Sequence, residues 1–138
     1  MKILLRLFLG LHVWMYRMTN GRFGGEMRGF KVLILTTKGR KSGRILHTPL
    51  GYFERDGGYY IVASNAGGDK NPAWYHNIKG NPGDVSIQVN ERKIKVTPQV
   101  VSGEPRRQVY DWIASLAPNY AEYEKSTKRE IPLLLLKG

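Results

Sequence analysis

The chain contains no cysteine among its 138 residues, and only three histidines. The missing thiols exclude disulfides, thiolate metal sites and cysteine nucleophiles, and they are compatible with a reducing compartment. His12, His47 and His76 lie far apart in the sequence and form neither an HExxH nor a CxxH spacing. We therefore expect no metal centre.

The motifs of the common self-sufficient enzymes are also missing. There is no GxSxG nucleophile elbow, no Walker loop and no Rossmann fingerprint. No two carboxylates are placed as a pair for acid–base hydrolysis. An enzyme without these groups usually takes its chemistry from a cofactor.

No apolar run is long enough to span a bilayer. Residues 2–18 are mostly apolar, but they are shorter than the roughly 20 residues a spanning helix needs, and they contain Arg6. The segment 14–17 lacks the small residues of a signal-peptide cleavage site. The cations fall on one side of the predicted helix, so it suits a membrane surface. Packing on its own core or on a second subunit fits equally well.

Acidic residues are half as frequent as basic ones, which leaves a net charge of +11. A chain this basic attracts nucleic acid, anionic lipid or a small ligand with phosphates or carboxylates. Four glycines between Asn20 and Gly29 indicate a linker. We expect an N-terminal segment over residues 1–29 and one folded domain over residues 30–138.

The hydrophobic pattern of that domain predicts a mainly β fold with short helices. Six strands are expected, over residues 31–37, 45–54, 59–63, 85–89, 94–101 and 131–136. Helices are expected over residues 72–79, 104–117 and 120–125. Asp56-Gly57 is a strong hairpin signal. Six short strands joined by hairpins favour an antiparallel closed or split β-barrel, which leaves few exposed edges.

Residues 61–75, IVASNAGGDKNPAWY, predict a buried strand, a glycine loop and a helix start. Asn71 is expected to cap the helix and Pro72 to occupy its first position. This geometry lets a flat or anionic ligand approach the backbone closely. A tight connection that binds nothing fits the same pattern.

A second candidate site is the segment 38–44, KGRKSGR. Its two glycines free the backbone to bind an oxyanion, and Arg40, Lys41 and Arg44 add positive charge. A solvated basic turn is the simpler interpretation. Tyr52 and Tyr59, with their aromatic neighbours, could stack on nucleic-acid bases, so that ligand class also stays open at this point.

Four motifs occur in order: LTTKGRKSGR at residues 35–44, TPL at 48–50, DGGYYIVASNAGGDKNPAWYHNIKGNP at 56–82 and PNYAEYEKSTKREIP at 118–132. Together they closely resemble the deazaflavin-dependent nitroreductase family, from about Trp14 to the C-terminus. That family comprises split β-barrel oxidoreductases that use coenzyme F420, a 5-deazaflavin with an oligoglutamate tail. The resemblance implies a six-stranded antiparallel split β-barrel of the FMN-binding type.

The resemblance also implies the site residues. The phosphate and tail of the coenzyme would be held by Arg40, Lys41, Ser42, Gly43 and Arg44. The ring would be lined by Thr48, Pro49, Leu50, Ala63, Ser64, Gly67, Gly68, Lys70, Asn71, Pro72 and Trp74. Ser64, Tyr120 and Tyr123 would act on the acceptor side, where a hydroxyl orients or protonates a quinone, a nitroaromatic or another activated unsaturated compound that takes the hydride.

The chain departs from the family pattern at Gly51, where members can carry an aromatic residue, so nitroreduction cannot be assumed. The expected setting is the cytoplasm, with residues 2–18 docking at the inner face of the membrane. Dimers are allowed and nucleic acid is not expected as a partner. The alternatives are an FMN-binding oxidoreductase of the same fold and a non-enzymatic basic module for nucleic acid or lipid.

Overall fold

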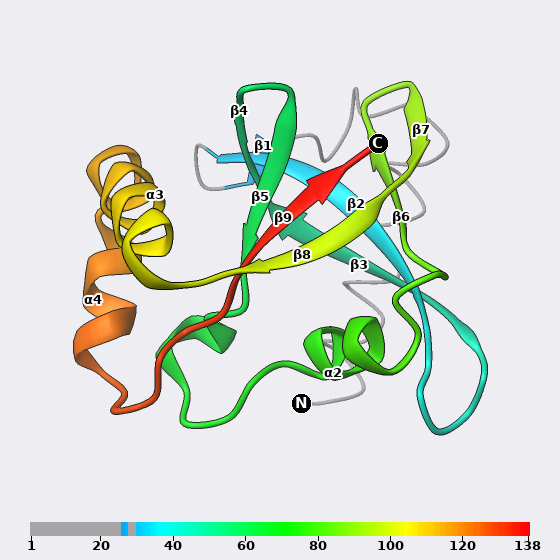
Figure 1. Ribbon diagram of the computed structural model, residues 1–138, viewed down its shortest axis with the longest axis horizontal. Helices are drawn as coiled ribbons and strands as arrows, with labels where there is room; N and C mark the ends of the chain where they lie inside the picture. The colour runs from blue at the N-terminus through cyan, green and yellow to red at the C-terminus, as the bar shows by residue number, and fades with distance from the viewer. Residues whose placement is uncertain (1–25, 28–29) are drawn as a thin grey trace.

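The computed structural model describes residues 26–27 and 30–138, which form two antiparallel sheets with helices around them (Figure 1). The first sheet contains β1 (Glu26–Met27), β2 (Phe30–Lys38), β3 (Ile45–Gly51), β6 (Ser86–Val89) and β7 (Arg92–Lys95). β2 is its central strand and pairs with β1, β3 and β6. The second sheet has the order β4 (Phe53–Arg55), β5 (Gly58–Val62), β9 (Leu133–Lys137) and β8 (Thr97–Val101).

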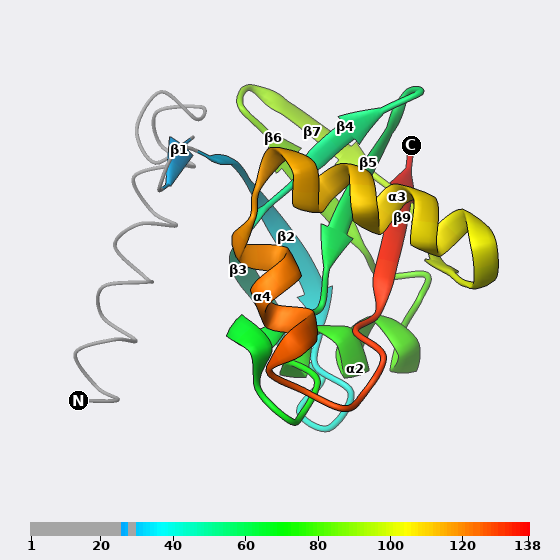
Figure 2. The same cartoon turned by 90° about the vertical axis from the view of Figure 1, so that its left-hand side faces the viewer.

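Three α-helices and one 3-10 turn complete the described part of the chain. These elements are η1 (Asn65–Gly67), α2 (Ala73–Gly80), α3 (Gly103–Leu116) and α4 (Asn119–Lys125). Figures 1 and 2 show α3 and α4 together on the outside of the second sheet, whereas α2 lies at one end of both sheets. None of the described helices is both long and apolar enough to cross a membrane.

The predicted mainly β, antiparallel fold is confirmed, but the predicted number of six strands is wrong. Two expected strands each divide in two, at Tyr52 and at Val96, where the chain leaves one sheet for the other. β3 pairs with β2 whereas β4 pairs with β5, and β7 pairs with β6 whereas β8 pairs with β9. Both corner side chains are buried. In the described residues the two sheets stay separate ladders and form no closed barrel.

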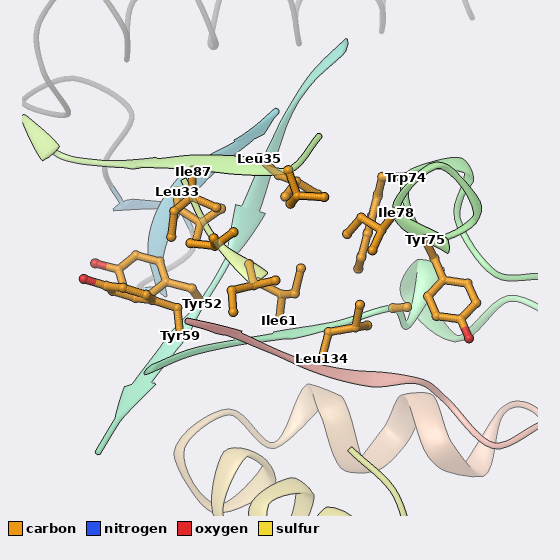
Figure 3. Close-up of a cluster of buried hydrophobic side chains, with 14 of the residues drawn as sticks. Leu33, Leu35, Tyr52, Tyr59, Ile61, Trp74, Tyr75, Ile78, Ile87 and Leu134 are labelled. Carbon is orange, nitrogen blue, oxygen red and sulfur yellow. The ribbon is translucent and has the colours of Figure 1, made fainter. Parts of the chain in front are cut away.

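The core lies between the two sheets, as Figure 3 shows. Leu33 and Leu35 of β2 are fully buried there against Ile61 of β5 and Leu134 of β9. Trp74 and Ile78 of α2 point into the same cluster. Successive strand residues face opposite sides, so the neighbours of these β5 and β9 residues pack on the other face, under α3 and α4. The second sheet is therefore covered on both faces.

The hairpin predicted at Asp56-Gly57 is confirmed. Arg55 pairs with Gly58, and the two turn residues have positive φ angles of 53° and 78°. This geometry matches the twist of the flanking strands. The predicted linker contains β1, whose Glu26 and Met27 pair with β2. The predicted N-terminal helix lies outside the described residues.

The predicted cap of α2 is wrong. Pro72 occupies the position before the helix, and no side chain caps the first turn. Asn71 instead accepts a hydrogen bond from Arg129, with 2.6 Å between its Oδ1 and Nη1 of the arginine. A charged donor makes a stronger hydrogen bond than a neutral backbone N–H, so it takes the amide oxygen.

Candidate active site

The loop that follows β5 adopts an unusual backbone conformation. Asn65, Ala66 and Gly67 have consecutive positive φ angles of 48°, 53° and 82°. For Ala66 this left-handed region costs roughly 1–2 kcal/mol, whereas asparagine adopts it more readily. The turn closes with hydrogen bonds from the Gly67 N–H to the Ser64 carbonyl and from the Gly68 N–H to the Asn65 carbonyl. The Asn65 side chain also donates to the Lys70 carbonyl at 3.0 Å. Contacts from elsewhere in the chain add to these local bonds.

The side chain of Arg129 supplies those contacts. It reaches across from the segment between α4 and β9, and all three guanidinium nitrogens donate into the loop. The acceptors are five oxygen atoms, of Ala63 (3.4 Å), Ser64 (3.0 Å), Gly68 (3.0 Å), Lys70 (3.3 Å) and the Asn71 side chain (2.6 Å). The Ala63 N–H also donates to the Pro132 carbonyl at 2.9 Å, so backbone bonding continues into β9.

Helix α4 packs directly on this loop at Gly67. A Cβ at Gly67 would overlap the Ser126 hydroxyl and would lie 3.3 Å from the Cα of Tyr123. The Ser126 hydroxyl lies 3.0 Å from the Gly67 carbonyl and 2.9 Å from the Tyr123 carbonyl, so its one proton is shared between the loop and α4. The sequence predicted that this glycine allows a ligand to approach closely. In the structure the close neighbour at that Cα is α4, which brings Tyr123 beside the loop.

Ser64 and the two predicted tyrosines therefore belong to neighbouring elements. The ring of Tyr120 contacts Phe53 and Tyr123 edge to face, with centroids 5.6 Å and 5.5 Å apart. The Tyr110 hydroxyl donates to the Tyr120 carbonyl at 2.8 Å and ties α4 to α3. Burial, reinforced by the neighbouring Tyr123, raises the pKa of Tyr120 to about 12. Its hydroxyl is therefore a neutral donor throughout the physiological range.

The basic loop between β2 and β3 lies against α2. Nη1 of Arg40 donates to the side-chain oxygen of Asn77 at 2.8 Å and to the Ala73 carbonyl at 3.4 Å. The Ser42 hydroxyl is used within the loop, where it accepts from the Arg44 N–H at 3.1 Å. Arg40 and Ser42 thus shape the loop. Lys41 and Arg44 are exposed, and their side chains form no hydrogen bond or ion pair with the described residues.

The other predicted ring-lining residues divide into three groups. Thr48, Pro49 and Leu50 lie half-buried on β3, opposite Leu35, Ile34 and Leu33 of β2. Lys70 is exposed and Pro72 is half-buried. Trp74, predicted as a wall of the ligand site, is 7% exposed and packs into the core. The pattern of aromatic residues near a helix start does not distinguish these two roles.

Two residues that shape the site were not singled out from the sequence. Arg129 lies in Lys128-Arg129-Glu130, which reads as a solvated charge run. Asn77 holds the basic loop and is 4% exposed. The sequence feature that could have identified Asn77 is its polar side chain at an inward position of α2, because a buried amide needs hydrogen-bond partners.

A family model described as F420H(2)-dependent quinone reductase matches residues 8–137. The chain belongs to this family. It is 38% identical over 135 residues to an F420H(2)-dependent quinone reductase of Mycobacterium tuberculosis, covering 93% of this chain and 88% of that one. It is therefore an F420-dependent oxidoreductase, and coenzyme F420 is its cofactor, as the resemblance implied.

Two solved structures are similar to this chain. An F420-H2 dependent reductase superposes with a TM-score of 0.70 and 36% identity, over 77% of this chain and 93% of that one. A second structure, described as a domain-swapped dimer, superposes with a TM-score of 0.72 and 33% identity, over 90% of this chain and 94% of that one.

The close packing at Gly67 predicts a large loss of stability when a methyl group is added. Gly67→Ala combines backbone strain with overlap against α4, and should lower the free energy of unfolding by about 1–3 kcal/mol in urea denaturation. Gly57→Ala is the matched control, because Gly57 also has a positive φ but no atom lies within 4 Å of the added Cβ. Equal losses in the two variants would show that α4 contributes nothing at this position.

Proposed function

We propose that this reductase binds the anionic tail of coenzyme F420 on the basic loop and the ring along residues 63–68. The observation that supports this proposal is that two surfaces carry hydrogen-bond donors without acceptors in the described part of the chain. Lys41 and Arg44 have no partner among the described residues, and the N–H groups of Ser64, Asn65 and Ala66 donate no hydrogen bond there. The first surface suits carboxylates and phosphate, and the second suits the polar edge of a flat ring.

Helix α2 links these two surfaces. Arg40 fastens the basic loop to Ala73 and Asn77 of α2, and Asn71 and Pro72 lead into the same helix. A ligand with a ring at one end and a charged tail at the other fits this arrangement. When bound, the reduced deazaflavin supplies the hydride. Thr48, Pro49 and Leu50 are proposed to line the ring from the first sheet.

On the acceptor side, the hydroxyl groups of Ser64, Tyr120 and Tyr123 are proposed to orient or protonate the acceptor. Tyr120 keeps its proton because burial raises its pKa to about 12, so it can donate to an acceptor oxygen that gains negative charge. We propose that Gly51, where family members can carry an aromatic residue, makes the acceptor pocket wider. A quinone is the proposed acceptor, and nitroaromatics are a secondary class.

We further propose that the two sheets form a split β-barrel. The sheet changes at Tyr52 and Val96 support this reading, because each turns a strand from one ladder into the other. Such corners bend a sheet around a common core without closing it.

Binding of the anionic coenzyme tail can be tested at the two exposed cations of the basic loop. Lys41→Ala and Arg44→Ala should each weaken coenzyme binding by about 1–3 kcal/mol, because each removes a charge-assisted hydrogen bond to a carboxylate or phosphate. Fluorescence titration measures the effect. FMN, which has a phosphate but no oligoglutamate, is the control ligand and should lose less. A double variant with unchanged affinity for F420 would place the tail elsewhere.

The second prediction concerns the acceptor. Tyr120→Phe should leave coenzyme affinity nearly intact and lower the turnover of quinone, because only the hydroxyl is removed. In the wild type, raising the pH from 6 to 9 should not deprotonate Tyr120. The raised pKa means that its proton is lost only as the pH climbs through about 12. Unchanged turnover in the variant would remove Tyr120 from the mechanism.

The third prediction concerns the N-terminus. We propose that residues 2–18 dock the enzyme on the inner face of the cytoplasmic membrane, where lipid-soluble quinones are reached. Deleting residues 1–18 should abolish sedimentation with anionic liposomes. Undiminished liposome binding would contradict the proposal. A change in oligomeric state by light scattering, with no change in liposome binding, would assign the segment to subunit contact.

A further inference from the structure

The contacts of Arg129 determine how a whole row of peptide groups is oriented. Its guanidinium binds the carbonyl oxygens of Ala63, Ser64, Gly68 and Lys70. No peptide bond of the described chain is cis, and in a planar trans peptide the N–H points opposite to the C=O. The N–H groups that follow these carbonyls therefore point away from Arg129. They belong to Ser64, Asn65, Asp69 and Asn71.

None of those four N–H groups donates a hydrogen bond within the described residues. For Asp69 and Asn65, which are exposed, water can serve as the acceptor. Ser64 is only 8% exposed, and a buried N–H without a partner is rare in native proteins. The row of donors near Ser64 thus lacks an acceptor that a bound ligand could provide.

We propose that Arg129 is a positioning residue of the coenzyme site. It binds the side of the loop on which the carbonyl groups point, so that the amide donors beginning at Ser64 face the carbonyl-bearing edge of the deazaflavin ring. This inference rests on the proposed function. A fixed cation on the carbonyl side also polarises the peptides, which strengthens their N–H groups as donors and favours negative charge on the ring edge.

Only arginine can serve all these acceptors at once. Its planar guanidinium carries five N–H donors in a fixed fork, whereas a lysine ammonium offers three donors from a single point. The acceptors extend from residue 63 to residue 71, and the left-handed residues lie between them. Loss of the fork should therefore release the loop while leaving the sheets in place.

The outer side of Arg129 is open to small molecules. Arg129 lines a hollow of about 580 Å³ together with Asp69 and residues 125–128. If the side chain is truncated, free guanidinium ion can enter from this side and replace it. Rescue of the truncated variant by free guanidinium ion would therefore show that the guanidinium group of Arg129 itself is what orients the loop.

The test uses the full-length protein with Arg129→Ala and Arg129→Lys. Both variants should raise the dissociation constant for F420 about tenfold or more. Without coenzyme, amide hydrogen exchange should become faster in residues 63–71 but not in β2. Guanidinium chloride, far below denaturing concentrations, should restore affinity and slow exchange in Arg129→Ala. Arg55→Lys is the matched control, because Arg55 lies on the β4–β5 hairpin, where its guanidinium faces Asp56 and the Trp112 ring and not the loop after β5.

Wild-type affinity and wild-type exchange in both Arg129 variants would overturn the inference and leave the proposed function intact. Faster exchange in β2 as well as in the loop would also overturn it, because that result means general unfolding. If the wild type fails to bind F420, the proposed site fails. The coenzyme-free exchange measurement would then still decide whether Arg129 orients the loop.

Discussion

The convergence of one guanidinium on five oxygens of a single loop is the interaction on which the site depends. Arg129 binds backbone between Ala63 and Lys70 and the side chain of Asn71. These contacts add to the local bonds of a loop in which Asn65 and Ala66 are both left-handed. The same contacts explain why Asn71 does not cap α2. A charge-assisted bond therefore sets both the shape of the loop and the start of the next helix.

Helix α4 forms the other boundary of the site, and it is fixed at several points. Ser126 bonds Gly67, Tyr110 bonds the Tyr120 carbonyl, and Arg107 forms a two-nitrogen contact with Glu124 at 2.8 Å and 3.0 Å. Because α4 carries Tyr120 and Tyr123, these contacts hold the proposed acceptor side against the proposed ring side. The basic loop is fastened separately, through Arg40 and Asn77. The surfaces proposed for the coenzyme are thus prearranged, which would reduce the ordering cost of binding.

The sequence predicted most strands, the three described helices, the hairpin at Asp56-Gly57 and the family. It did not predict the strand breaks at Tyr52 and Val96, because the apolar pattern continues through each corner while the pairing partner changes. Trp74 was expected at the ligand and packs in the core cluster, and a large aromatic side chain on an inward helix face suits both positions. Arg129 was missed because its acceptors are mainly backbone carbonyls some sixty residues away, and no residue pattern marks them. Long-range contacts to the backbone leave little trace in a single sequence.

Hydride transfer from reduced F420 to a quinone is proposed to take place between the loop after β5 and α4. Anaerobic stopped-flow oxidation of the reduced deazaflavin, against a panel of quinones and nitroaromatics, tests this claim most directly. We expect enzyme-dependent oxidation of the reduced deazaflavin that saturates with quinone, and no comparable turnover with reduced FMN. Oxidation of reduced FMN in preference to the deazaflavin, or no oxidation by any quinone in the panel, would contradict it.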